Sequence, residues 1–156
     1  MLLDAARSIA TTPLNAWLQA HTNVIAFLQA VHILMLGLTF GSALLFSLRV
    51  LGRFRADEPA AAVWARFSPW LWAGFAVMAT TGALLAIGEP VRQASALSFW
   101  IKMALIAVGI TALLALRRNN SRGLAWTVIA TWVVIVFLGR AIAYDVEVWG
   151  AWSLAA

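Results

Sequence analysis

An uncharged apolar stretch from Val24 to Leu48 constrains this chain more than any other feature of its sequence. At about 1.5 Å of rise per residue, a helix of this length crosses a hydrocarbon core of roughly 30 Å. We therefore predict a membrane-spanning helix over residues 23–49. Within it, Gly37 and Gly41 form a small-xxx-small step that lets another helix backbone approach closely.

The composition extends this prediction to the whole chain of 156 residues. It is 63% hydrophobic and only 11% charged, whereas about a quarter of the residues of soluble domains are charged. The chain has no cysteine, which excludes disulfides, thiolate metal sites and a catalytic cysteine. Its net charge of +5 does not indicate nucleic-acid binding, because the arginines stand at the ends of apolar stretches.

Three more spans are predicted over residues 67–88, 94–116 and 123–144, with Pro69 in the first turn of the second one. Residues 1–21 and 145–156 are expected to lie at the membrane interface as an N-terminal segment and a tail. We thus expect one all-α membrane domain over 1–156, a polytopic four-transmembrane-helix bundle. Because the connections are short, sequential helices should be antiparallel neighbours.

The charge distribution predicts the orientation in the membrane. The loops that join the first span to the second and the third to the fourth hold seven of the eleven cationic residues: Arg49, Arg53, Arg55, Arg66, Arg117, Arg118 and Arg122. Cytoplasmic loops carry such an excess. We therefore expect a multi-pass protein of the bacterial inner membrane, with both termini periplasmic.

Several ionisable residues fall in the outer half of this bundle: His32, Lys102, Arg140, Glu89 and Arg92. Ionisable groups at membrane depth usually face the bundle interior or a polar cavity and mark function. The long side chains of Lys102 and Arg140 could instead extend to the headgroups. Arg140 is also placed at a depth where it could pair with Glu89.

His32 is too short to reach the headgroups from the middle of its span. Its imidazole is either satisfied by a neighbouring hydroxyl, such as that of Thr80 or Thr81, or it binds a metal. Haem and copper are the two metal-containing candidates. The sequence shows no phosphate-binding loop, HExxH motif or nucleophile elbow, so it does not identify an enzyme.

A haem with two histidine ligands does not fit one chain. His21 and His32 would lie about 16 Å apart along one helix and cannot clamp one iron. Haem b could still be bound by His32 with Met78 or Met103, by His32 alone, or by His32 shared with another chain. The residues expected to pair with the haem propionates are Arg92, Lys102 and Arg140.

Copper is the alternative metal. His32 and Met35 lie on neighbouring turns of one helix face, and imidazole with thioether suits Cu(I). Met78 and Met103 could complete such a site.

Four segments resemble a family of small, uncharacterised four-helix bacterial inner-membrane proteins. They are AVHILMLGLTFGSALLFSLRVLG, MATTGALL, SFWIKMALI and LGRAIAY, within residues 24–144. They are more distantly similar to the membrane domain of copper-resistance protein D. The resemblance implies a four-helix domain beside a redox or metal-handling system, with recurring positions at His32, Gly37, Gly41, Thr81-Gly82 and Lys102.

The sequence therefore predicts an integral membrane subunit that is haem-associated, for electron transfer or anchoring, with His32 as axial ligand. One alternative is copper handling through His32 and Met35. The other is a cofactor-free accessory subunit of a larger membrane complex. The expected partners are the lipid bilayer and either further copies of the chain or other membrane subunits.

Overall fold

The computed structural model describes residues 1–153, and these residues form helices and loops without a strand. Four helices are long and apolar enough to cross a membrane. They are α3 (Thr22–Val50), α4 (Ala60–Gly88), α6 (Leu97–Asn119) and α7 (Arg122–Ala141). The predicted all-helical fold with four such helices is confirmed. Residues 154–156 of the predicted tail lie outside the described residues.

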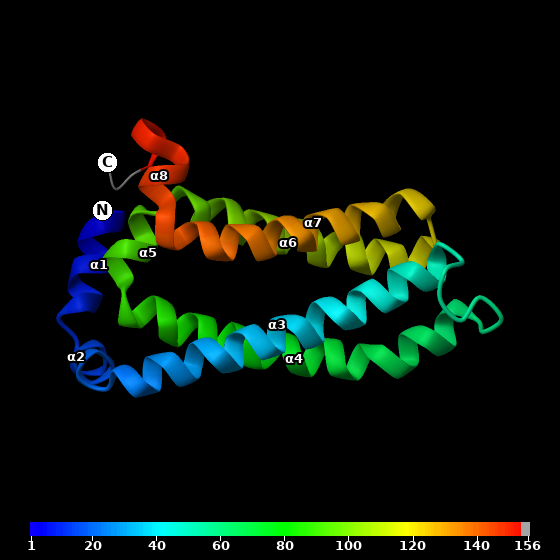
Figure 1. Ribbon diagram of the computed structural model, residues 1–156, viewed down its shortest axis with the longest axis horizontal. Coiled ribbons are helices and arrows are strands. Elements are labelled where there is room, and N and C mark those ends of the chain that lie inside the picture. The colour runs from blue at the N-terminus through cyan, green and yellow to red at the C-terminus, as the bar shows by residue number, and fades with distance from the viewer. Residues whose placement is uncertain (154–156) are drawn as a thin grey trace.

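The four long helices form two antiparallel hairpins, α3–α4 and α6–α7, which are stacked as two layers (Figure 1). Across the layers α3 packs on α7, whereas the backbones of α4 and α6 stay apart along most of their length. The short helix α5 (Pro90–Ser95) connects α4 to α6. Sequential long helices are thus neighbours within each hairpin, and our prediction is wrong for the middle pair.

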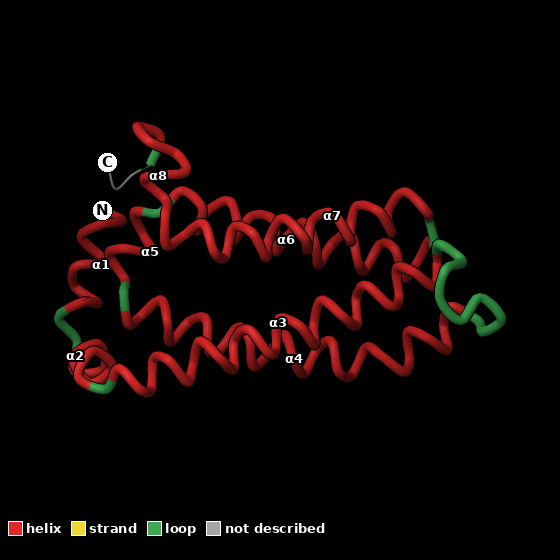
Figure 2. The backbone as a smooth tube through the Cα atoms, in the orientation of Figure 1, coloured by secondary structure: helices red, strands yellow, loops and turns green. Residues whose placement is uncertain are grey.

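The short helices lie at the end of the bundle opposite to the loops that close the two hairpins (Figure 2). They are α1 (Leu2–Ala10), α2 (Pro13–Ala20), α5, η1 (Ile142–Tyr144), α8 (Asp145–Trp149) and η2 (Gly150–Trp152). An even number of long helices returns the chain to the side where it began. The N-terminus and the last described residues therefore share one end of the molecule.

Two predicted helix boundaries need correction. α4 begins at Ala60 rather than at residue 67, because the sequence after Pro59 is rich in alanine, the best helix former. Pro69 consequently lies inside the helix and not in its first turn. α6 begins at Leu97 rather than at residue 94, because Ala96 has an extended backbone that separates α5 from α6.

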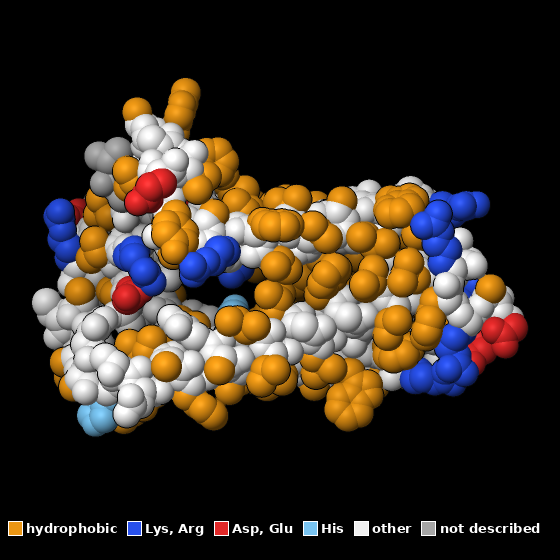
Figure 3. All heavy atoms as spheres, in the orientation of Figure 1, with side chains coloured by type: hydrophobic (Ala, Val, Ile, Leu, Met, Phe, Trp, Pro, Cys, Tyr) orange, Lys and Arg blue, Asp and Glu red, His pale blue; other side chains and the backbone are white. Residues whose placement is uncertain are grey.

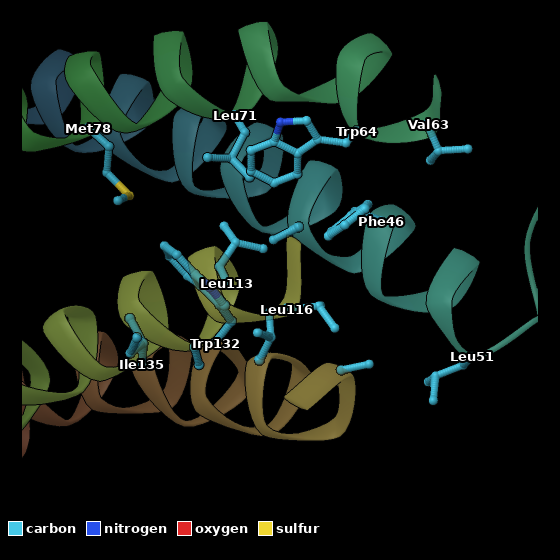
Figure 4. Close-up of a cluster of buried hydrophobic side chains, with 14 residues drawn as sticks. Phe46, Leu51, Val63, Trp64, Leu71, Met78, Leu113, Leu116, Trp132 and Ile135 are labelled. Carbon is cyan, nitrogen blue, oxygen red and sulfur yellow. The ribbon is translucent and has the colours of Figure 1, made fainter. Parts of the chain in front are cut away.

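The hydrophobic core fills the half of the bundle next to the hairpin loops (Figure 4). Phe46 packs edge-on against Trp64 with ring centroids 5.0 Å apart, and Trp132 is 1% exposed. Two cation–π contacts join the layers at this end. The Arg117 guanidinium lies 5.2 Å from the Trp64 ring, and that of Arg53 lies 5.6 Å from the Trp126 ring.

The N-terminal segment is fastened to the end of α4. Asn15 Nδ2 donates to the carbonyls of Ile87 (2.8 Å) and Gly88 (3.0 Å), and Gln19 also donates to Gly88. The last carbonyls of a helix have no partner within the helix. These bonds satisfy them and hold α2 over this end of the α3–α4 layer.

The C-terminal segment is fastened to the beginning of α6. The buried Asp145 carboxylate accepts hydrogen bonds from the backbone N–H groups of Leu97 (2.9 Å) and Ser98 (2.8 Å), and from the Ser153 hydroxyl (2.7 Å). Trp149 Nε1 donates to the Ser98 hydroxyl at 2.8 Å. Asp145 therefore caps a helix that is distant in sequence, as an N-cap residue does locally.

Candidate functional site

Polar side chains replace apolar ones along the core-facing stripes of the helices near the end that carries the short helices. His32 is seven residues before the fully buried Thr39 on α3, and Lys102 is seven residues before the buried Gly109 on α6. Residues seven apart lie on the same helix face. His32 and Lys102 therefore face the space between the two layers rather than the outside of the bundle.

This space is a hollow. The buried members of the core reach no further than Met78 on α4 and Ile135 on α7. Beyond them the surface is hollowed between the layers, with basic and histidine side chains on the walls (Figure 3). His32 and Lys102 are only half-buried, although their stripes face inward. We call this space the hollow. His32 and Thr81 lie on one side of it, and Lys102 and Gly139 lie on the other.

The His32 imidazole is held by Thr81. Its Nδ1 lies 3.0 Å from Thr81 Oγ1, and that hydroxyl donates to the carbonyls of Val77 (2.9 Å) and Met78 (3.1 Å). Because the hydroxyl proton is directed to the helix backbone, we assign the proton of the imidazole to Nδ1, which donates to Oγ1. Of the two hydroxyls that the sequence offers as partners of His32, Thr81 makes the bond, whereas the exposed Thr80 bonds the Ala76 carbonyl.

The same assignment leaves Nε2 of His32 with a free lone pair. Within residues 1–153, the hydrogen-bond partners of the His32 ring are the Thr81 hydroxyl and the Met78 backbone carbonyl. Both lie on α4, and a carbonyl accepts from an N–H, so neither bond uses the lone pair of Nε2. Gly82, the next residue on α4, makes room for the ring. A Cβ atom at Gly82 would lie 3.0 Å from His32 Cε1. The Thr81-Gly82 step therefore seats and orients the imidazole.

Lys102 occupies the opposite layer. Its Nζ lies 3.6 Å from the position of a Cβ atom at Gly139 of α7, and it is within electrostatic range of His32. In the part of the chain that the structure describes, its ammonium group has no hydrogen bond or ion pair. Sequence reasoning missed Gly139, which is four residues after the buried Ile135 on the core-facing stripe of α7.

The two arginines predicted for the site are engaged elsewhere. Arg92 forms an ion pair with Glu89. Arg140 donates to the Tyr144 hydroxyl at 2.9 Å, and its guanidinium lies 4.9 Å from the centre of that ring. The predicted pair between Arg140 and Glu89 is therefore wrong, because each of them has a partner one helical turn away.

The candidate methionines are dispersed. Met35 is half-buried and packs against the core, and Met78 is 5% exposed and points from α4 into the core (Figure 4). Met103 is 38% exposed. The structure thus brings Met78 to the core edge of the hollow and leaves Met103 outside it.

Other metal donors are scarce. Residues 1–153 contain no group of three or more His, Cys, Asp or Glu residues that could hold a metal ion. His21 is exposed at the junction of α2 and α3, where its ring stacks on Trp17 with centroids 4.7 Å apart and its Nδ1 bonds the Trp17 carbonyl. It lies outside the hollow, as the exclusion of a bis-histidine site within one chain requires.

A family model matches residues 15–154 of the chain, and its description is "Family of unknown function (DUF6644)". The chain belongs to this family. No curated protein and no solved structure matches the chain. Nothing in these comparisons links it to copper-resistance protein D. A proposal for its function must therefore rest on the residues of the hollow.

Proposed function

We propose that this member of the DUF6644 family is a haem-associated membrane subunit in which Nε2 of His32 is the axial ligand of haem b. The observation that carries the proposal is the position of the imidazole. Its Nδ1 lies 3.0 Å from Thr81 Oγ1, so in the tautomer that we assign Nε2 presents its lone pair to the hollow. Histidines that bind metals almost always donate their other ring N–H to a fixed acceptor.

The donor set favours haem over a bare metal ion. A porphyrin supplies four nitrogen ligands of its own, so one protein imidazole is enough. Copper bound by His32 and Met35 would need further donors, and the described residues offer no cluster of His, Cys, Asp or Glu beside them. A bound haem would supply one-electron redox chemistry, which suits a subunit for electron transfer or anchoring.

Absorption spectra of the detergent-purified protein, with and without dithionite, test the proposal. We expect a Soret band that is lost in His32→Ala and retained in His21→Ala, the matched control outside the hollow. A protein that shows no Soret band after expression with added haem, or a band that survives in His32→Ala, would refute it. Bound copper without haem absorption would favour the copper alternative. The absence of both copper and haem absorption would favour a cofactor-free accessory subunit.

We also propose that the protein lies in the bacterial inner membrane with both ends periplasmic. The support is the excess of arginine in the first hairpin loop and in the helix ends that adjoin both hairpin loops. The chain lacks cysteine, so Ser8→Cys and Ser121→Cys each introduce a single thiol at one end of the bundle. An impermeant maleimide should label Ser8→Cys but not Ser121→Cys in intact spheroplasts, and the opposite pattern would reverse the orientation.

For the quaternary structure we propose self-association through the outer face of α3 and α4. Gly37 and Gly41 open on a shallow groove of about 370 Å³ beside Trp70, which is 60% exposed. No atom of residues 1–153 lies within 4 Å of a Cβ atom at either glycine, so a second helix could approach. Light scattering in detergent should give the mass of an oligomer that Gly41→Leu reduces to that of a monomer. A monomeric unmodified protein would contradict this proposal.

A further inference from the structure

We propose that the hollow binds the carboxylate of an amphiphile, with the Lys102 ammonium as its anchor and the apolar part of the ligand between the two layers. The carboxylate could come from a haem propionate or from a fatty acid of the bilayer. The inference rests on the proposed function only for the first of these sources.

Lys102 is the only lysine of the chain, and among residues 1–153 no acidic group pairs with its ammonium. Other cations near the ends of the bundle have acidic or aromatic partners, including Arg7 with Asp4, Arg92 with Glu89, and Arg140 with Tyr144. Placing an ammonium group between helices at membrane depth is costly unless it is paired. A carboxylate in the hollow would offset that cost, which gives the ligand its driving force.

The surroundings of Lys102 suit the rest of an amphiphile. Leu28, Leu85 and Leu105 lie one helical turn from His32, Thr81 and Lys102, and all three are half-buried. The space-filling view shows that the hollow is open sideways between the two layers on the face that is drawn (Figure 3). An apolar chain could therefore enter from the bilayer without crossing the aqueous phase.

His32 distinguishes the two sources of the carboxylate. With its proton on Nδ1, the ring presents a lone pair to the hollow and cannot donate to an anion from Nε2. Binding of a fatty acid should therefore depend on Lys102 and not on His32. Binding of haem should depend on both residues.

Spin-labelled stearic acid, added to the purified protein in detergent, tests the inference by electron paramagnetic resonance. We expect an immobilised fraction whose affinity is roughly tenfold or more higher than that of the methyl ester, because the ester lacks the charge. Lys102→Gln should bind the acid no better than the ester. Lys102→Arg should retain the preference, since it keeps the cation, and Arg118→Gln is the control for loss of a remote positive charge.

The outcomes separate this inference from the proposed function. If the acid is preferred in the unmodified protein and in His32→Ala but not in Lys102→Gln, the inference stands, whether or not a Soret band is present. Titration with haem and with haem dimethyl ester then reports whether propionates use the same lysine. Equal immobilisation of the acid and its methyl ester, or an unchanged preference in Lys102→Gln, would overturn the inference.

Discussion

Replacing Gly82 by alanine should weaken ligand binding at His32 while the free energy of unfolding of the protein hardly changes. Gly82 lies within α4, next to the His32 ring. An added Cβ atom would lie 3.0 Å from Cε1 and 3.5 Å from Nδ1 of His32. Ordinary contacts between carbon atoms are about 3.5–4.0 Å, so the ring must retreat by about 0.5 Å.

That movement is enough to weaken the bond to Thr81. The distance from Nδ1 to Oγ1 would grow from 3.0 Å to about 3.5 Å, beyond the usual range of a hydrogen bond. Its loss costs about 1 kcal/mol, while replacing a glycine by alanine within a helix gains about 0.5–1 kcal/mol. The two terms nearly cancel, so the free energy of unfolding should hardly change. The affinity for haem should fall roughly 10–100-fold, as it does when a metal-binding histidine loses its orienting partner.

Haem titration and thermal unfolding, followed by the fluorescence of the nine tryptophans, measure the two quantities on the same sample. Gly88→Ala is the matched control on α4, because its Cβ atom would make only ordinary contacts, at 3.9 Å with Ile25 and 4.0 Å with Leu18. If Gly82→Ala binds haem as tightly as the unmodified protein and the Gly88→Ala control, Thr81 and Gly82 do not orient a ligand.

Three further predictions concern the contacts that close the two ends of the bundle. Asp145→Ala should cost about 1–2 kcal/mol, because it removes the cap of α6, and lower the melting temperature by a few degrees; an unchanged value would show that the cap is dispensable. Arg117→Gln should cost about 0.5–2 kcal/mol through its cation–π contact with the Trp64 ring, while the neighbouring Arg118→Gln should leave the melting temperature unchanged; equal effects of the two variants would argue against the contact. The hydrogen bond from Arg55 lowers the pKa of Glu58 in the loop between α3 and α4. The stability that Glu58 contributes should therefore be fully present above the ordinary glutamate pKa and be lost as the pH falls through the lowered value. Melting curves recorded from neutral to acidic pH should show this loss in the unmodified protein and less of it in Glu58→Gln, and parallel curves would contradict the prediction.

The fold was predictable for helices whose own sequence indicates a membrane span. Uncharged apolar stretches such as 24–48 define a span without reference to the rest of the chain. The bond between His32 and Thr81 was also within reach, because a short polar side chain at membrane depth needs a partner and few hydroxyls lie at its level. Boundaries were less predictable, since the helix-forming residues after Pro59 extend α4 beyond its apolar part.

Contacts that depend on the chain folding back were not predictable in the same way. Asp145 caps α6 from a segment almost fifty residues later in the sequence. Asn15, which precedes α3 in the sequence, donates to the carbonyl at the end of α4. One signal was present in the sequence. Ala96 precedes α6 but has no side-chain oxygen that could cap it, so the first N–H groups of α6 needed an acceptor from elsewhere. The sequence alone does not say that Asp145 supplies it.

The hollow follows from an uneven distribution of volume along the core-facing stripes. Near the hairpin loops these stripes carry large side chains such as Phe46, Trp64 and Trp132, which fill the space between the layers. Toward the short helices the same stripes carry Thr81, Gly82 and Gly139, which are too small to meet across the layers. Because separate contacts close the two ends of the bundle, the helices do not need a packed core at the level of the hollow. His32 and Lys102 therefore lie outside the packed core and face the hollow.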